Sequence, residues 1–209
     1  MAMTITPTST FRWLLCGSVI WLCACASAPP RTAPLPGELA DQASVLGQPY
    51  LREWGDELSP YAAEVLAKSD EELRQLFGGI MGREHHYLAL SGGGENGAFS
   101  AGLLAGWTAS GTRPEFTLVT GISTGALIAP FAFLGPDYDD DLKAVYTGYS
   151  MDDLIDKRSL RNIIRNDAVT DSTPMQAVIA KYMTAEAMEA IAVEYRKGRI
   201  LLIGTTDLD

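Results

Sequence analysis

The sequence has few histidines, few cysteines and few basic residues, and each shortage narrows the chemistry that it can support. Only two of the 209 residues are histidines, the adjacent His85 and His86, so histidine-dependent catalysis has few candidates. The three cysteines, Cys16, Cys23 and Cys25, stand near the start, and no Cys-x-x-Cys or His/Cys cluster follows, which excludes a structural zinc site. We therefore expect no metal and no cofactor.

Basic residues are outnumbered, with 16 Lys and Arg against 26 Asp and Glu, and the net charge is −10. This balance argues against nucleic acid as a partner, because phosphates require a basic face. Hydrophobic residues make up 47% and charged residues 20%, which is enough apolar material for a sizeable core and excludes wholesale disorder. The length suggests one domain with extensions.

The longest apolar run near the N-terminus is too short to cross a membrane. It covers residues 13–22, and ten helical residues rise about 15 Å, half of a hydrocarbon core of roughly 30 Å. Residues 1–24 therefore predict a signal peptide. A buried N-terminal helix is the alternative, but four prolines between positions 29 and 36 disfavour it.

The end of this segment, Leu22-Cys23-Ala24-Cys25, resembles the lipobox of bacterial lipoproteins. The resemblance implies that Cys25 carries diacylglycerol and becomes the mature N-terminus. Ala26 and Ser27 follow instead of Asp, which implies an exported lipoprotein in the outer membrane, facing the periplasm. Two or more acyl chains would anchor it firmly, at about 0.8 kcal/mol for each buried CH₂. Ordinary secretion with incidental cysteines is the alternative.

The remaining chain divides into a proline-rich tether over 25–58, a helical lead-in over 59–84 and one main domain over 86–209. Ser59-Pro60 predicts the first helix start, with a cap and then proline at the first helical position. In the main domain, short apolar runs alternate with helix-length segments, which predicts a mainly parallel sheet in an α/β fold. The expected strands are 87–90, 116–120 and 200–203; the expected helices are 96–111, 124–134, 137–150 and 173–197.

Two of these helices are apolar nearly all round. Because such a helix has no polar face for solvent, we expect both 96–111 and 124–134 to be deeply buried. Pro130 lies inside the second, where a proline is expected to kink the helix.

Gly121-Ile122-Ser123-Thr124-Gly125 has the Gly-x-Ser-x-Gly spacing of a nucleophile elbow, between a predicted strand and a predicted helix. The flanking glycines allow a tight, strained turn that leaves the serine hydroxyl exposed. The helix that follows favours negative charge at its N-terminus. We therefore predict Ser123 as a catalytic nucleophile.

A glycine triplet, Gly92, Gly93 and Gly94, follows the first predicted strand. Its N–H groups can converge on one point without a side chain in the way, as an oxyanion hole requires. Gly92, Gly94 and Gly97 also match Gly-x-Gly-x-x-Gly, the fingerprint of a dinucleotide site. That site needs an acidic residue at the end of the next strand, where this sequence has Ser123 instead. The oxyanion hole is the favoured interpretation.

No histidine follows Ser123, as a Ser-His-Asp triad of the α/β-hydrolase kind would require. His85 and His86 precede the first strand, so we expect them, solvated, at the opposite end of the sheet. Either a carboxylate acts directly on the serine, or the site is inactive.

The segment LALSGGGENGAFSAG at 88–102, the elbow and the terminal TTDLD together resemble the patatin-like phospholipases. The resemblance implies a three-layer α/β hydrolase fold with a mainly parallel central sheet over 86–209. It also implies a Ser–Asp dyad, with Ser123 as nucleophile and Gly92, Gly93 and Gly94 as the oxyanion hole. The family loop usually carries Arg or Lys two residues after the triplet, where this chain has Asn96.

The family's catalytic aspartate stands in an Asp-Gly-Gly or Asp-Gly-Ala motif, and this sequence holds no Asp-Gly dipeptide. Asp207 and Asp209 lack that motif. We therefore expect the domain to be incomplete at its C-terminus, with the dyad aspartate beyond this chain.

The resemblance implies a serine hydrolase of lipid acyl esters, similar to phospholipase A or lysophospholipase. Its partners would be the lipid substrate and, through Cys25, the membrane. The alternative is a non-catalytic envelope lipoprotein that keeps the fold for binding or scaffolding.

Overall fold

The computed structural model describes residues 51–157 and 170–206, with five isolated positions between 36 and 47. The predicted signal peptide 1–24, the predicted lipidation site Cys25, and the acidic residues Asp207 and Asp209 lie outside the described residues.

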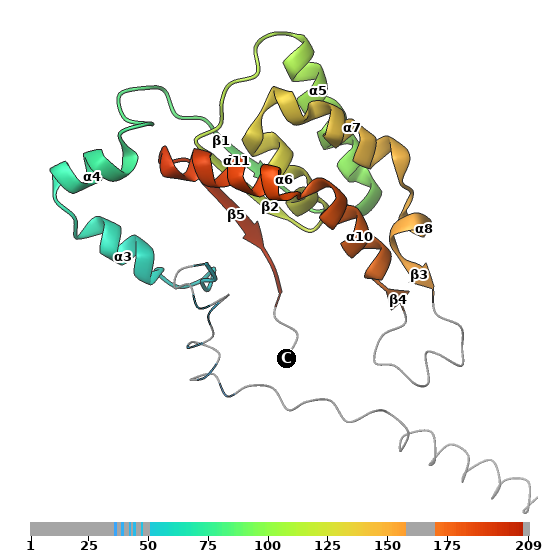
Figure 1. The fold of residues 1–209 in the computed structure, drawn as a ribbon, viewed down its shortest axis with the longest axis horizontal. Helices are drawn as coiled ribbons and strands as arrows, with labels where there is room; N and C mark the ends of the chain where they lie inside the picture. The colour runs from blue at the N-terminus through green and yellow to red at the C-terminus, as the bar shows by residue number, and fades with distance from the viewer. Residues whose placement is uncertain are drawn as a thin grey trace, which may run out of the picture.

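Three parallel strands form the centre of the domain, in the order β1-β2-β5 (Figure 1). The strands are β1 (Tyr87–Leu90), β2 (Leu118–Ile122) and β5 (Ile200–Gly204). Gly121 pairs with Leu90 on one side and with Ile203 on the other. The predicted parallel sheet is confirmed. The second strand starts two residues later than expected and continues through Ile122, so that it ends directly at Ser123.

Helices fill the connections between the strands. They are α5 (Gly97–Ala109), α6 (Thr124–Leu134), α7 (Asp139–Gly148), α8 (Met151–Leu154), α10 (Thr173–Tyr182) and α11 (Ala185–Arg196). The main domain also contains short elements: the 3₁₀ turns η1 (Gly94–Asn96) and η2 (Pro136–Tyr138), and a small antiparallel pair of β3 (Asp156–Lys157) with β4 (Thr170–Asp171).

The described helices of the main domain cover one face of the sheet. Leu90 and Val119 on that face are buried in a core shared with α5, α6 and α7. The opposite face exposes Tyr87, Ile122 and Leu202, with 68%, 53% and 52% of their surfaces accessible. The described residues therefore contain a sheet layer and one helical layer of an α/β fold.

The two strongly apolar helices differ in burial. Helix α6 buries seven residues and contacts all three strands, so its predicted burial is confirmed. The prediction for α5 is wrong, because Phe99 is 75% and Leu103 56% exposed. Helix α5 lies at the margin of the helical layer, and one side of it packs on α6 and α7. Apolar composition alone does not reveal that the other side has no neighbour among the described residues.

The segment expected as one helix over 173–197 is two helices, separated at Met183 and Thr184. The Thr184 hydroxyl caps the second helix, accepting a hydrogen bond from the Ala187 N–H at 3.3 Å. A capping threonine and an acidic residue in the first turn, here Glu186, indicate a helix start. The prediction of one continuous helix missed this signal.

The lead-in contains two short helices, α3 (Pro60–Leu66) and α4 (Asp70–Phe77). Ser59 caps α3 as predicted, since its hydroxyl accepts from the Ala62 N–H at 2.8 Å. Ser69 and Glu72 form a capping box that starts α4. Neither helix buries a residue fully. Tyr61 of α3 makes a side-chain hydrogen bond with Tyr195 of α11. That hydrogen bond, together with burial, raises the pKa of Tyr195 to about 12.

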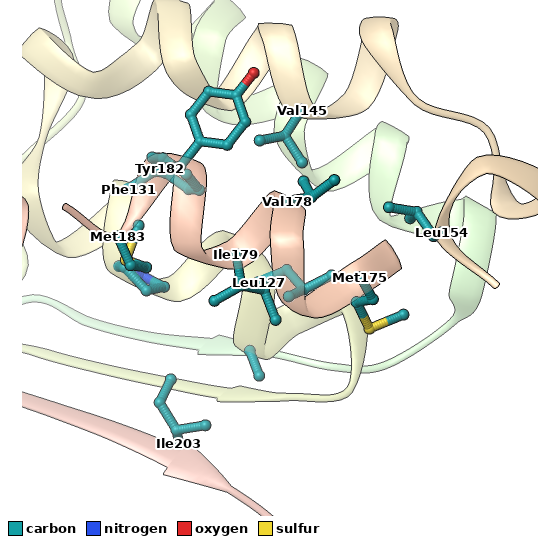
Figure 2. Close-up of a pocket in the computed structure, with 12 residues that line it drawn as sticks. Leu127, Phe131, Val145, Leu154, Met175, Val178, Ile179, Tyr182, Met183 and Ile203 are labelled. Atoms are coloured by element: carbon teal, nitrogen blue, oxygen red, sulfur yellow. The ribbon is translucent and has the colours of Figure 1, made fainter. Parts of the chain in front are cut away.

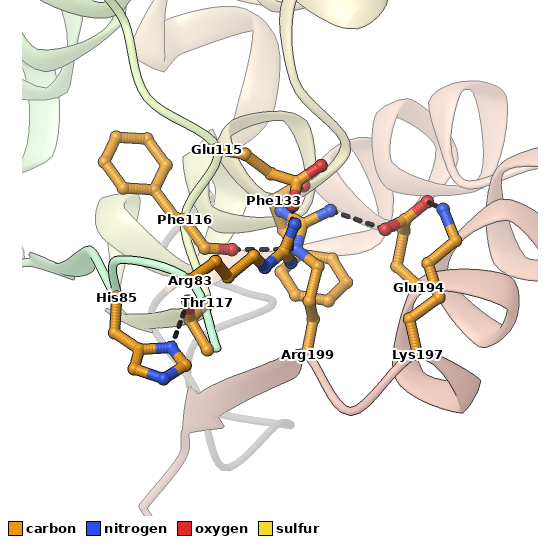
Figure 3. A network of polar contacts seen from close by, with 9 residues as sticks. All are labelled: Arg83, His85, Glu115, Phe116, Thr117, Phe133, Glu194, Lys197 and Arg199. Carbon is orange, nitrogen blue, oxygen red and sulfur yellow. Dashed lines mark hydrogen bonds and ion pairs between the residues drawn. The ribbon is translucent and has the colours of Figure 1, made fainter. Parts of the chain in front are cut away.

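Arg199 joins three parts of the chain at the N-terminal end of the sheet (Figure 3). It is 2% exposed, and its Nε donates to the Phe116 carbonyl at 2.8 Å. Its two terminal nitrogens donate to the Phe133 carbonyl at the end of α6 and to Glu194 on α11. Burial alone would raise the pKa of Glu194, but hydrogen bonds from Lys197 and Arg199 outweigh it and lower that pKa.

Candidate active site

Ser123 lies at the turn between β2 and α6, and its backbone is strained. Its φ of +53° and ψ of −125° make it the one non-glycine residue with positive φ within the described ranges. Such a conformation costs on the order of 1–3 kcal/mol, and it persists where the surrounding structure enforces it. The residue is exposed, so its hydroxyl is accessible to a substrate.

The two glycines of the elbow are required by close contacts. A side chain at Gly121 would overlap the backbone of Gly125, and a side chain at Gly125 would overlap the carbonyl of Leu90. The first turn of α6 therefore presses directly against the ends of β1 and β2. This packing holds the serine turn in its strained form, as the Gly-x-Ser-x-Gly spacing predicted.

The first glycine of the triplet, Gly92, lies against Ser123. A Cβ placed on Gly92 would be 2.9 Å from the Ser123 Cβ and 3.4 Å from its Oγ. All three glycines are exposed, and the N–H groups of Gly93 and Gly94 donate to no described residue. The two predicted site elements therefore meet at Gly92, and the next two residues of the loop have N–H groups without a described acceptor.

The serine hydroxyl is not used to cap the helix that follows it. Ser123 is the N-cap residue of α6, and its side chain makes no capping hydrogen bond. The N-terminus of an α-helix carries a partial positive charge that stabilises an anion close to it. The geometry can therefore support an alkoxide-like nucleophile and a developing oxyanion at the same point.

The Tyr146 hydroxyl contacts Thr124, the first residue of α6, and this contact was not predicted from the sequence. Tyr146 on α7 donates to the Thr124 carbonyl at 3.2 Å, and its Oη lies 2.7 Å from the Thr124 Oγ1. Burial raises the pKa of Tyr146, so the phenol remains protonated as a donor. The two residues are 22 positions apart, and helical periodicity gives no signal for such a contact.

Comparison with known protein families decides the identity of this fold. Residues 88–198, more than half of the chain, match the family model described as patatin-like phospholipase. The chain belongs to the patatin-like phospholipase family. No curated protein and no solved structure matches it. Membership of the patatin-like family supports a lipid acyl hydrolase function in general, and the matched range contains both the glycine triplet and the Ser123 elbow.

The histidines of this patatin-like chain lie where the sequence placed them. They precede β1, whose first residue Tyr87 pairs with Leu118 at the start of β2, while Ser123 follows the other end of β2. The His85 Nδ1 lies 3.2 Å from the Thr117 Oγ1 (Figure 3). Histidine is therefore positioned away from the serine.

No hydrogen bond joins the Ser123 hydroxyl to another residue within 51–157 and 170–206. The same ranges contain no group of three or more His, Cys, Asp or Glu residues that could hold a metal ion. No helix in the described part of this patatin-like chain is long and apolar enough to span a bilayer.

Proposed function

We propose that this patatin-like protein is a serine hydrolase of lipid acyl esters, with Ser123 as its nucleophile. The observation that carries the proposal is the contact between an exposed, strained Ser123 and the Gly92–Gly94 loop. The serine oxygen attacks the ester carbonyl carbon, and the carbonyl oxygen becomes an oxyanion beside the loop N–H groups. Collapse of this intermediate expels the alcohol and leaves an acyl-serine.

The serine must lose its proton as it attacks. An aspartate carboxylate outside the described residues would accept that proton, pass it to the leaving alcohol, and then activate the water that releases the fatty acid. This completes the proposed Ser–Asp dyad. The glycine loop would contribute about 3–4 kcal/mol of transition-state stabilisation for each N–H donor.

Fatty-acid release tests the proposal against a purely binding role. The full-length gene product is incubated with phospholipid and lysophospholipid vesicles and with a soluble ester, and free fatty acids are quantified by mass spectrometry. We expect release from at least one lipid ester. Absence of release by folded protein, with lipid binding intact, would instead support the non-catalytic alternative.

We also propose that Cys25 is lipidated and that it anchors the protein to the outer membrane, facing the periplasm. The support is the Leu22–Cys25 lipobox together with Ala26 and Ser27. In cells given an alkyne-labelled fatty acid, we expect incorporation that is lost in Cys25→Ser. Cys23→Ser is the matched control, because that cysteine does not occupy the lipidated position. Labelling that persists in Cys25→Ser would overturn the assignment.

A further inference from the structure

An apolar pocket, partly open to solvent, lies between α6 and α10 and has a volume of about 230 Å³ (Figure 2). The facing helices contribute most of its walls, and Met183 after α10 and single residues of α7, α8 and β5 close the rest. The lining residues are Ala126, Leu127, Pro130, Phe131, Val145, Leu154, Met175, Val178, Ile179, Tyr182, Met183 and Ile203.

None of these twelve side chains is charged, and the Tyr182 hydroxyl is the one hydroxyl or amide group among them. A polar ligand buried here would lose hydration without gaining hydrogen bonds, at a cost of roughly 1–3 kcal/mol for each group. Burial of an aliphatic chain is instead favourable, by about 0.8 kcal/mol for each CH₂ removed from water. The chemistry of the walls therefore selects an unsubstituted aliphatic chain.

Two lining residues follow the candidate nucleophile in the first turn of the same helix, although Ser123 itself does not line the pocket. Ala126 and Leu127 belong to the first turn of α6, directly after Ser123, and Ile203 stands on the strand position paired with Gly121. Pro130 lies one turn further along the same face. As a proline it cannot donate a hydrogen bond to the Ala126 carbonyl, yet α6 continues without a break from Thr124 to Leu134.

The volume sets the length of chain that fits. An apolar cavity of about 150 Å³ accommodates benzene, or about 25 Å³ for each carbon. By the same measure, a pocket of about 230 Å³ holds about nine carbons.

We propose that this pocket binds the acyl chain of the ester cleaved at Ser123 and makes the enzyme selective for medium chains of about eight to ten carbons. The inference rests on the proposed function, because it assigns the leaving acyl group to this pocket. Val178 on α10 and Leu127 on α6 line the two facing walls and would determine the chain length.

A chain-length series tests the selectivity. We expect kcat/KM of the full-length protein for p-nitrophenyl esters of two to sixteen carbons to be highest near eight to ten carbons. Val178→Trp fills the pocket and should lower the ratio of ten-carbon to four-carbon kcat/KM by at least about tenfold. Val178→Ala widens it and should move the optimum to longer chains. Val193→Trp, the same change on α11 outside the pocket lining, should keep the wild-type profile.

Failure of the pocket assignment is distinguishable from failure of the proposed function. Hydrolysis with a chain-length profile that neither Val178 variant moves would overturn the pocket assignment alone. If no ester is cleaved, calorimetric titration of Ser123→Ala with decanoate and with butyrate tests the pocket assignment on its own. Preferential decanoate binding that Val178→Trp removes supports the pocket, whereas equal binding of the two acids would overturn it.

Discussion

Replacing Ser123 by alanine is expected to reduce fatty-acid release by a factor on the order of 10³ or more. The alanine lacks the oxygen that forms the acyl-enzyme. No other serine within the described residues has this strained backbone beside the glycine loop. Removing the hydroxyl breaks no capping hydrogen bond, so the fold should be unaffected. Initial rates on the best lipid ester, with circular dichroism of both proteins, measure the effect.

Ser172→Ala is the matched control. Ser172 also precedes a helix, α10, it is exposed, and its side chain likewise makes no capping hydrogen bond. We expect this variant to retain wild-type rates. If Ser123→Ala kept more than a tenth of the activity, a different residue would have to be the nucleophile.

Replacing Arg199 by alanine is expected to lower the free energy of unfolding by about 3–5 kcal/mol. The substitution removes a cation that is 2% exposed and leaves the Phe116 and Phe133 carbonyls without their donor. It also separates Glu194 from one of its two cationic partners. The Arg199 guanidinium lies 4.4 Å from the Phe133 ring centroid, so packing is lost as well. Urea unfolding measures the change.

Arg196→Ala provides the comparison for a surface ion pair. Arg196 pairs with Glu189 at 2.6 Å, but their side chains are 61% and 66% exposed. Exposed pairs contribute about 0–1 kcal/mol, so this variant should unfold near the wild-type midpoint. Equal stability of the two variants would show that Arg199 does not join the sheet to α6 and α11 as described.

The elements around Ser123 were predictable because their signals are local. Two glycines, a preceding apolar strand and a following apolar helix all lie within twenty residues, and each constrains the chain by its own conformational limits. The histidines were also placed correctly, since a residue that precedes a parallel strand lies at the end opposite the site.

The missed features depend on contacts between distant residues. Tyr146 reaches Thr124 over 22 positions, and Arg199 reaches Phe133 and Phe116 over 66 and 83 positions. Phe99 was expected to be buried, yet burial depends on which neighbours pack against α5 and not on apolar composition. The pocket likewise forms only where α10 folds back against α6.

The most direct test of Ser123 as nucleophile is covalent labelling with a fluorophosphonate. The reagent phosphonylates an activated serine oxygen and releases fluoride, and digestion with tandem mass spectrometry locates the adduct. We expect one adduct on full-length protein, at Ser123, and none in Ser123→Ala. An adduct on another serine, or no adduct on folded protein that hydrolyses esters, would contradict the assignment.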